Sequence, residues 1–239
     1  MDIRGLSKLT LLDYPEHIAC TLFTGGCNFR CPFCHNGGLV LDSTAQPQID
    51  DSLLFDFLNA RKGKLEGVCI TGGEPTIQQG LSDILKKIKA MGFLTKLDTN
   101  GYQPAVLLDL ISKGLLDMVA MDIKNAPGKY AETAGLNPRT FDLGRINESI
   151  SILKNSGVAH EFRTTIVREY HTKIDMAEIS EWLSGPSAYY LQAYKDAEDI
   201  IYKYNKSSAV SAPTDLEMMT YLSIVRTHLP NSHIRGSEE

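Results

Sequence analysis

The chain has 239 residues, 43% of them hydrophobic, and a formal net charge of −5 at pH 7. This size and composition suit one globular domain, which we expect to span residues 1–239. The sequence has neither a basic block nor an apolar run of bilayer length, and its start lacks a signal-peptide core, so we expect a cytoplasmic protein that binds no nucleic acid and no membrane.

The first half of the chain alternates between short apolar runs and amphipathic segments. After a lead-in segment at residues 1–16, runs of β-forming residues predict strands at 17–23, 67–71, 94–98 and 118–123. Apolar residues spaced three or four apart predict helices at 51–60, 77–91 and 105–113.

The second half begins with an irregular stretch and then continues the same alternation. Residues 125–143 hold prolines and glycines and predict a long loop with a helical turn. The patterns that follow predict helices at 145–155 and 174–183 and strands at 160–167 and 189–193. Residues 214–239 are expected to form a C-terminal helix through His228, capped by Thr214 or Asp215, and a tail in which 233–235 could pair at the sheet edge.

Strand and helix therefore alternate about six times. This order predicts parallel strands joined by right-handed helical crossovers. Because six units do not fill an eight-unit barrel, we expect an α/β fold, a partial and open (β/α)6 TIM-like barrel.

Three of the five cysteines lie in one loop, directly after the first predicted strand. Cys27, Cys31 and Cys34 stand at the spacing Cx3Cx2C within residues 25–36, which read GGCNFRCPFCHN. Three thiolates this close together can converge on an iron–sulfur cube, each binding one iron. The fourth iron would then have no protein ligand and could bind another molecule.

Two other uses of these cysteines have to be weighed. A structural zinc site needs a fourth ligand, for which His35, Cys20 and Cys69 are the candidates. His35 directly follows Cys34 and is poorly placed, and Cys20 and Cys69 lie inside predicted strands, where a cysteine typically serves as a small buried side chain. The odd number of cysteines and the absence of a signal peptide disfavour a disulfide framework.

The spacing, with Phe33 just before the last cysteine, resembles the cluster loop of the radical S-adenosylmethionine (radical SAM) superfamily. The resemblance implies a [4Fe-4S] cluster held by the three cysteines, with Phe33 beside the cofactors. It also implies that the open iron binds the amino and carboxylate groups of S-adenosylmethionine (SAM), which is cleaved reductively to a 5′-deoxyadenosyl radical. In such an enzyme the protein supplies geometry, electrostatics and shielding.

The segment Gly72-Gly73-Glu74-Pro75 follows the second predicted strand. Alone it could be a plain turn. The resemblance implies that Gly72, Gly73 and Glu74 line the amino group of SAM, with Glu74 either holding the ammonium directly or setting the shape of the loop.

Two segments, Asp98-Thr99-Asn100-Gly101 and Asp122-Ile123-Lys124, lie at the ends of the third and fourth predicted strands. Asn-Gly is a common turn, and Asp and Lys two residues apart on a strand face the same side and could simply pair. The segments also resemble those of glycyl-radical-enzyme activases. This resemblance implies that Asp98, Thr99 and Asp122 bind a monovalent cation beside the SAM carboxylate, and that Asn100 and Lys124 contact SAM.

Arg163 lies within the predicted strand at 160–167. It could be an ordinary strand arginine whose stem packs against apolar neighbours. The resemblance implies a contact with the SAM carboxylate or ribose. Relatives often place a histidine after the sixth strand near the adenosyl group, whereas this chain has Gln192-Ala193-Tyr194-Lys195 there, so that role stays open.

Taken together, the segments GLSKLTLLDYP, GGCNFRCPFCHN, GGEP, DTNG and MDIK resemble the activating proteins of anaerobic ribonucleoside-triphosphate reductase, with the pyruvate formate-lyase activases as near relatives. The resemblance implies removal of a hydrogen atom from a glycine of a partner glycyl radical enzyme, with electrons from a flavodoxin or ferredoxin type donor. Two other possibilities stay open at this point: a radical SAM enzyme acting on a small molecule or peptide, and a non-catalytic metal-binding protein.

Overall fold

A computed structural model describes residues 1–205 and 209–236 of the chain. Its centre is one eight-stranded sheet whose strands lie side by side in chain order. The strands are β1 (Ile3–Thr10), β2 (Ala19–Thr24), β3 (Gly67–Gly72), β4 (Leu94–Thr99), β5 (Met118–Asp122), β6 (Ala159–Ile166), β7 (Ala188–Ala193) and β8 (Ser232–Ile234). β1 runs antiparallel to β2, and all later neighbours are parallel. β1 and β8 form the two ends of the sheet, so the barrel is open.

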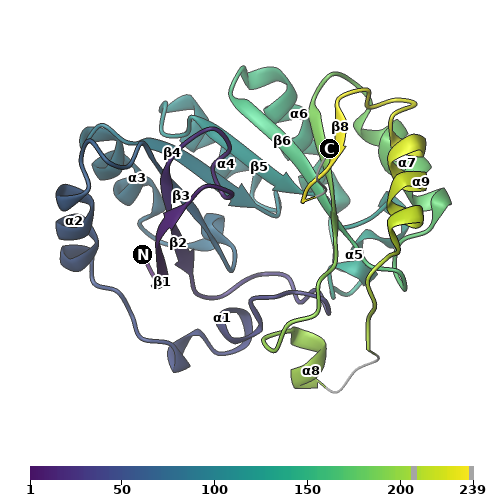
Figure 1. Ribbon diagram of the computed structural model, residues 1–239, viewed down its shortest axis with the longest axis horizontal. Coiled ribbons are helices and arrows are strands. Elements are labelled where there is room, and N and C mark those ends of the chain that lie inside the picture. Colours follow the sequence, from purple (N-terminus) through teal and green to yellow (C-terminus); the bar gives the residue numbers. More distant parts are fainter. Residues whose placement is uncertain (206–208, 237–239) are drawn as a thin grey trace.

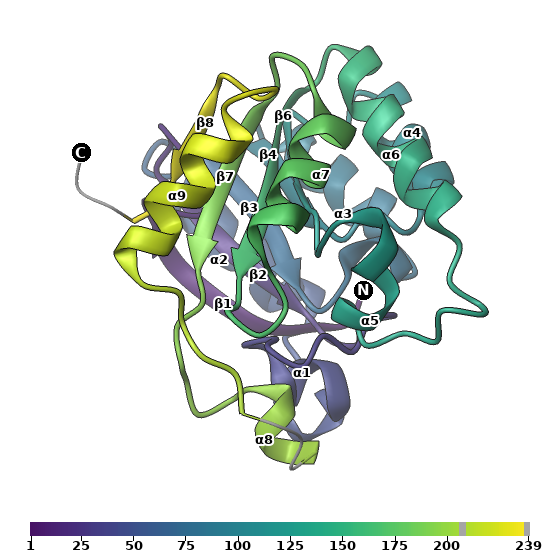
Figure 2. The same cartoon turned by 90° about the vertical axis from the view of Figure 1, so that its right-hand side faces the viewer.

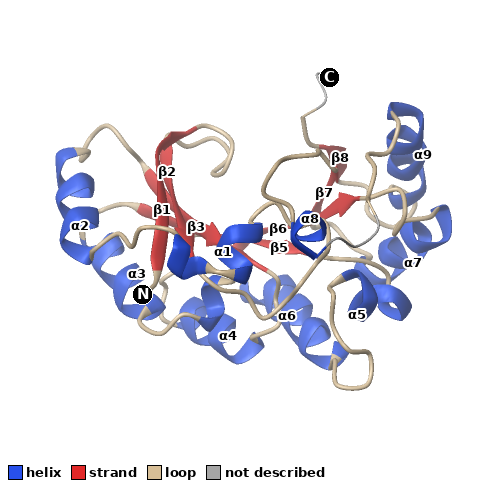
Figure 3. Ribbon diagram, turned by 90° about the horizontal axis from the view of Figure 1, so that it is seen from below, coloured by secondary structure: helices blue, strands red, loops and turns tan. Residues whose placement is uncertain are grey.

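Helices cover the outer face of the curved sheet, and the strands lie inside their arc (Figure 3). The helices are α1 (Gly37–Leu41), α2 (Asp51–Ala60), α3 (Leu81–Ala90), α4 (Pro104–Ser112), α5 (Tyr130–Thr133), α6 (Leu143–Ser156), α7 (Lys173–Leu183), α8 (Ile201–Asn205) and α9 (Asp215–Val225). Short 3-10 turns lie at Ser43–Ala45, Pro75–Ile77 and Pro127–Lys129. Within the described ranges, no helix is both long and apolar enough to cross a bilayer.

The partial barrel predicted from the sequence is confirmed. The six predicted strands correspond to β2–β7, and the predicted edge pairing at 233–235 corresponds to β8, which pairs with β7. The lead-in differs from expectation, since Ile3–Thr10 forms the edge strand β1. Its glycine and charged residues hide the period-two pattern, and its pairing with β2 comes from a distant partner. Residues 237–239 of the expected tail lie outside the described residues.

Helix boundaries follow local signals with two exceptions, one of which is that α9 ends at Val225, before the predicted end at His228. The predicted helix at 77–91 begins only at Leu81, because Gly80 precedes it in a left-handed conformation with φ of 82°. The predicted cap of the last helix is confirmed: the Thr214 hydroxyl accepts from the Glu217 peptide and the Glu217 side chain accepts in return. Gly157, with φ of 76°, ends α6.

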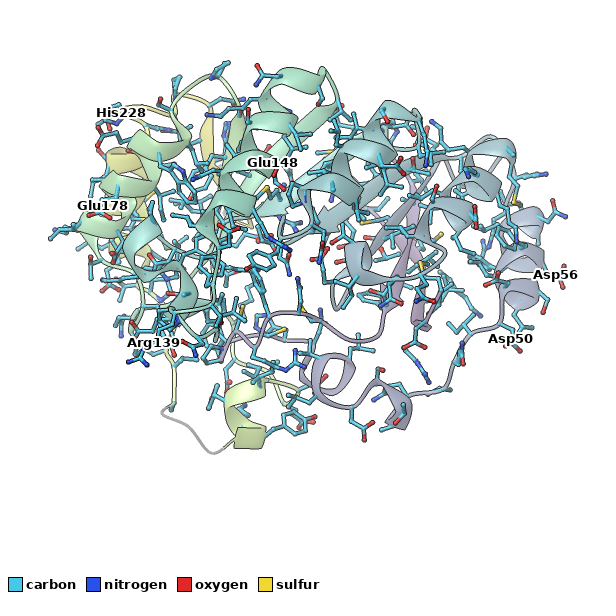
Figure 4. All side chains as sticks on the ribbon, turned by 180° about the vertical axis from the view of Figure 1, so that it is seen from behind. Asp50, Asp56, Arg139, Glu148, Glu178 and His228 are labelled. Carbon is cyan, nitrogen blue, oxygen red and sulfur yellow. The ribbon has the colours of Figure 1, made fainter. Side chains whose placement is uncertain are left out.

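The two faces of the sheet differ in polarity. On β4, Leu97 belongs to the apolar core, whereas Lys96 and Asp98 project to the opposite, inner side and pair with each other. Charged residues also cover the outside of the helices, as Glu148 on α6 and Glu178 on α7 illustrate (Figure 4). The inner face of the barrel is therefore polar, and the apolar core lies between the sheet and the helices.

Two short helices that the sequence did not predict, α1 and α8, lie side by side below the carboxyl ends of the strands (Figures 1 and 2). The Gly37 N–H donates to the carbonyl of Asp199 at 3.0 Å. The Ile201 and Tyr202 N–H groups donate to the carbonyls of Cys34 and Pro32 at 3.2 and 2.9 Å. The segment after β7 is thus fastened to the cysteine loop by main-chain hydrogen bonds.

Candidate active site

The cysteine loop lies at the carboxyl edge of the sheet and borders one cavity of about 170 Å³. The predicted site residues that line this cavity come from four separate segments of the chain: Cys27, Cys31, Phe33, Cys34, Gly72, Gly73, Glu74, Asp98, Thr99, Asn100, Asp122 and Lys124. Arg163 lies beneath them, bonded to two of these residues. The fold therefore brings together the residues that the sequence singled out.

The loop is held by its backbone and by one aromatic side chain. The Gly26 N–H donates to the Leu39 carbonyl at 2.7 Å, and the Arg30 N–H donates to the Ala134 carbonyl at 2.9 Å. Phe29 is buried and meets the Tyr102 ring edge-on at 5.5 Å between centroids. These contacts fix both sides of Cys27, so the thiols are presented on an ordered loop.

Five free cysteines are present, and they divide into two groups. Cys20 and Cys69 are fully buried inside β2 and β3, which confirms their prediction as core residues. Cys27, Cys31 and Cys34 line the cavity. Among the described residues, no three or more His, Cys, Asp and Glu side chains gather around a point suited to one metal ion. A cluster that gives each cysteine its own iron fits this donor set better than a single zinc ion does.

Burial raises the pKa of the Cys27 thiol to about 12, and the nearby Glu74 carboxylate adds to the effect. Burial also raises the pKa of Cys31 to about 12 and raises that of Cys34. The thiols are therefore protonated at neutral pH. Since iron binds the thiolate, loading the site releases protons.

The glycines after β3 allow two loops to touch. Gly72 has φ of 105°, and a Cβ on it would lie 2.4 Å from the Thr24 nitrogen. A Cβ on Gly73 would lie 1.8 Å from the Gly26 carbonyl oxygen. Their peptide groups also bond within the protein: the Gly73 N–H donates to the Thr24 carbonyl at 2.8 Å, and the Gly72 carbonyl accepts from Asn36 at 2.6 Å. The glycines thus seat the segment against the start of the cysteine loop.

Glu74 is 1% exposed and connects three loops. Its Oε1 accepts from the Thr76 N–H at 3.0 Å and from the Thr99 hydroxyl at 2.7 Å. Its Oε2 accepts from the Asn100 N–H at 2.7 Å. Burial raises the pKa of this carboxyl group, although these hydrogen bonds oppose the effect. These hydrogen bonds set the shape of the loop, and a contact of Glu74 with the ammonium of SAM stays a prediction.

Asp98, Asp122, Lys124 and Arg163 form a continuous ion-pair network. Arg163 bridges the two carboxylates, at 3.1 Å to Asp98 and 2.9 Å to Asp122, and Lys124 pairs with Asp122 at 3.0 Å. Burial opposes each of these charges, but the opposite charges outweigh it: the pKa values of Asp98 and Asp122 are lowered, and those of Lys124 and Arg163 are raised. All four groups are ionised at neutral pH.

Sequence reasoning missed two residues in this region. Lys96 is fully buried and pairs with Asp98. Asn28 accepts a hydrogen bond from the Asn100 side chain at 2.7 Å, so it joins the cysteine loop to the end of β4. Lys96 could have been found from its position two residues before Asp98, because alternate strand residues share a face. Asn28 carries no comparable signal.

At the far side of the cysteine loop, the segment after β7 approaches His35. The His35 and Tyr194 rings stack with centroids 5.6 Å apart, and His35 Nε2 bonds to the Lys195 carbonyl at 2.5 Å. Phe33 is buried and faces Tyr170 at 5.8 Å. The residues after β7 therefore contact His35, which stays exposed, at this side of the loop.

A three-cysteine loop borders a cavity at the carboxyl edge of an open barrel, and the candidate site residues line this cavity. The comparison with protein families agrees with this arrangement. The profile of the family described as "Radical SAM superfamily" matches residues 21–183. The chain belongs to the radical SAM superfamily. Its cofactors are accordingly a [4Fe-4S] cluster and SAM, and it is an enzyme.

Similar proteins indicate which group of the radical SAM superfamily the chain belongs to. A Methanocaldococcus jannaschii protein, provisionally named as a glycyl-radical enzyme activating enzyme, is 30% identical over 98% of this chain and 95% of its own length. The pyruvate formate-lyase-activating enzyme of Clostridium pasteurianum is 32% identical over 69% of this chain and 68% of its own. The anaerobic ribonucleoside-triphosphate reductase-activating protein of Escherichia coli K12 is 36% identical, over 29% of this chain and 47% of its own. The chain therefore groups with the activating enzymes of glycyl-radical enzymes.

Solved structures support the fold. A radical SAM methyltransferase from Sphaerobacter thermophilus superposes with a TM-score of 0.71 at 16% identity, covering 93% of this chain and 67% of its own. Streptococcus suis SuiB bound to S-adenosylmethionine gives 0.65 at 13% identity, covering 89% and 49%. At these identities the likeness concerns the fold alone.

Proposed function

We propose that this enzyme generates a glycyl radical on a partner enzyme, and that the partner is an anaerobic ribonucleoside-triphosphate reductase. One observation carries the reaction class: the cysteine loop and the DTNG and DIK segments line one cavity, in a chain that aligns over nearly its whole length with a protein provisionally named as an activating enzyme. The narrower partner rests on the lead-in and motif resemblance and on the shorter Escherichia coli match.

In this proposal, Cys27, Cys31 and Cys34 hold the cluster. When bound, the cluster and SAM supply the one-electron chemistry that removes a hydrogen atom from glycine. The loop contacts of Cys27 keep the thiols ordered before loading. Their protonation in the unloaded protein means that a base in solution has to take up three protons as the iron binds.

The other site residues bind and orient SAM in this proposal. Lys124 and Arg163 offer the positive charge that a carboxylate needs, and Asn100 offers a side-chain amide at the same edge. Gly72 and Gly73 bring the third strand against the cysteine loop, so the amino group of SAM would meet peptide groups and Glu74 there. Glu74 acts first by holding Thr99 and Asn100 in place through the hydrogen bonds described above.

Catalysis by this chain then consists of positioning and exclusion of water. The partner glycine has to reach the cavity. In this proposal it enters on the side of the sheet where β1 and β8 do not pair with each other (Figure 3). Glycine suits this delivery because it has no side chain to block a close approach. We further propose a cytoplasmic location and a flavodoxin or ferredoxin type electron donor.

The deciding experiment uses electron paramagnetic resonance. The anaerobically reconstituted protein would be mixed with SAM, a strong reductant and purified anaerobic ribonucleoside-triphosphate reductase, with pyruvate formate-lyase as the comparison partner. We expect a glycyl radical doublet on the reductase, lost when its radical glycine is replaced by alanine. A doublet on pyruvate formate-lyase alone would show that this enzyme, and not the reductase, is the partner. Formation of 5′-deoxyadenosine with a radical on neither would contradict both proposed partners and favour a small-molecule or peptide substrate.

A further inference from the structure

Five charged side chains form a chain of ion pairs across the inner faces of β4, β5 and β6. Lys96 pairs with Asp98 Oδ1, and Arg163 pairs with Asp98 Oδ2 at 3.1 Å. On its other side, Arg163 pairs with Asp122 Oδ1 at 2.9 Å, and Lys124 pairs with Asp122 Oδ2 at 3.0 Å. Each of the four carboxylate oxygens therefore already has a cationic partner from this chain.

The charge balance of this network is already positive. Three cations surround two carboxylates, so the network carries one excess positive charge before any ligand binds. A monovalent cation bound between Asp98 and Asp122 would add a second. Water screens charges poorly at such a site, because the side chains of Asp98 and Arg163 are only 11% exposed. Repulsion from the three neighbouring cations therefore opposes such an ion.

The oxygen ligands predicted for a cation are also engaged. A hard cation needs several oxygen ligands around one point. The Thr99 hydroxyl donates to Glu74 at 2.7 Å and accepts from the Gly101 N–H at 3.1 Å. Thr99 also follows Asp98 directly on the strand, so their side chains leave the backbone on opposite sides. The residues present fit a free cation poorly.

Lys96 gives this network a positive charge from the protein itself. Its side chain is 0% exposed, and a lysine is almost never fully buried unless its charge is paired. It lies two residues before Asp98, deeper in the barrel than the carboxyl edge, and it does not line the cavity. Lys96 can therefore act on bound SAM only through Asp98 and Arg163.

We propose that the Lys96 ammonium is a built-in counter-cation that takes the place of the monovalent cation predicted at Asp98, Thr99 and Asp122. It is a positioning residue: it fixes Asp98, which fixes Arg163 and, through Asp122, the Lys124 ammonium at the cavity. The inference rests on the SAM-binding part of the proposed function and is independent of the partner enzyme. It follows that SAM affinity does not depend on potassium or sodium.

The test measures SAM affinity of the reconstituted holoenzyme in potassium, sodium or tetramethylammonium chloride at equal ionic strength. We expect the wild-type dissociation constant to stay within about twofold across the three salts. Lys96→Met removes one partner of a buried pair and should weaken SAM binding about tenfold or more in tetramethylammonium. Potassium should restore it, because a small ion can then neutralise Asp98. Lys113→Met, at an exposed ion pair on α4, is the matched control and should match the wild type.

Two results would overturn the inference: a wild-type affinity that rises about tenfold on adding potassium, or a Lys96→Met affinity that is unchanged in tetramethylammonium. Wild-type crystals soaked in rubidium chloride give a second readout that needs neither the variant nor SAM cleavage. No anomalous peak beside Asp98 and Asp122 is expected, and a peak there would refute the proposal. Failure of the wild type to bind SAM in every salt would instead count against the proposed function, and the rubidium result would still decide this inference.

Discussion

At the scale of single residues, some side chains line the cavity and others keep the cavity residues in position. Cys27 lines the cavity, whereas Cys69 lies inside β3 with no exposed surface. Glu74 and Lys96 are both buried and act through neighbouring residues. Burial by itself therefore does not distinguish a structural residue from a functional one here. The bonded neighbours of each residue make that distinction.

The cysteine assignment predicts a clear difference between two substitutions. Cys31→Ala should abolish cluster assembly and SAM cleavage in a soluble protein, because one iron loses its ligand. Cys69→Val replaces a buried side chain of β3 by one of similar volume and should retain both. Iron content, visible absorbance and 5′-deoxyadenosine formation measure the outcome. Full cleavage by Cys31→Ala would refute the cluster assignment, and loss of the cluster in Cys69→Val would make Cys69 a ligand.

At the scale of elements, the site depends on how closely the strand ends approach one another. The end of β3 touches the start of the cysteine loop through Gly73, and Glu74 ties it to the end of β4. A second connection between strands lies at their opposite end. There the Asp117 carboxylate, just before β5, accepts hydrogen bonds from Lys89 of α3 and from the Thr95 N–H of β4. Contacts of this kind set the relative positions of neighbouring strands.

Gly73→Ala tests the contact between the two loops. A Cβ 1.8 Å from the Gly26 carbonyl oxygen forces the loops apart, so we expect a loss of about 3 kcal/mol of stability and a weaker hold on the cluster. Gly128→Ala is the control, because its Cβ would meet no atom within 4 Å, and it should change stability by less than about 0.5 kcal/mol. Urea denaturation measures both. Equal stabilities of the two variants would contradict the close approach.

Asp117 gives a prediction about pH. Partial burial raises the pKa of its carboxyl group, but hydrogen bonds from Lys89 and the Thr95 peptide outweigh burial and lower the pKa. A pKa lowered by folding stabilises the protein above the unfolded value of about 3.9, and this contribution is lost as pH falls through the folded value.

Asp117→Asn should therefore cost about 1–2 kcal/mol at pH 7. The difference in free energy of unfolding between the wild type and the variant should shrink as the pH is lowered below about 4. There the wild-type carboxylate takes up a proton and loses the charge that the variant lacks at every pH. Denaturant titrations at several pH values measure the gap. A gap that stays constant down to the acid-unfolding range would mean that the charge of Asp117 is not what stabilises the folded protein.

At the scale of the whole molecule, the sheet assigns different roles to its two faces. Helices pack on the outer face, where Leu97 is buried in the apolar core, and the inner face carries the charges that lead to the cavity. Along β4, Leu97 therefore stabilises the apolar core, whereas its neighbours Lys96 and Asp98 belong to the charged inner face. β1 and β8 do not pair with each other, so the sheet stays open between them.

Leu97→Ala tests this division. Removing a buried leucine from the core should lower the free energy of unfolding by about 2–5 kcal/mol. The folded variant should bind SAM as the wild type does, because Leu97 faces away from the cavity. Leu108→Ala, at a leucine that is 49% exposed on α4, should cost less than about 1 kcal/mol. A selective loss of SAM affinity in Leu97→Ala would show that the two faces are coupled.

The sequence by itself determined the superfamily resemblance and most of the fold. Cysteine spacing, strand–helix alternation and the turns after each strand are local patterns, and they placed six parallel strands and the motifs at their carboxyl ends. Phe33, Glu74 and Lys124 line the same cavity for this reason. The single-domain boundaries, the cofactor contacts of individual residues and the cytoplasmic location stay predictions.

Only the tertiary structure decided how the parts meet. The pairing of Lys96 with Asp98, the bridge made by Arg163 from β6, the docking of α8 on the cysteine loop and the strand β1 all depend on partners far away in the chain. The physical reason is that ion pairs and hydrogen bonds between distant segments depend on strand register and on which face each side chain occupies. Register follows from the packing of the whole sheet, and no local pattern in the sequence contains it.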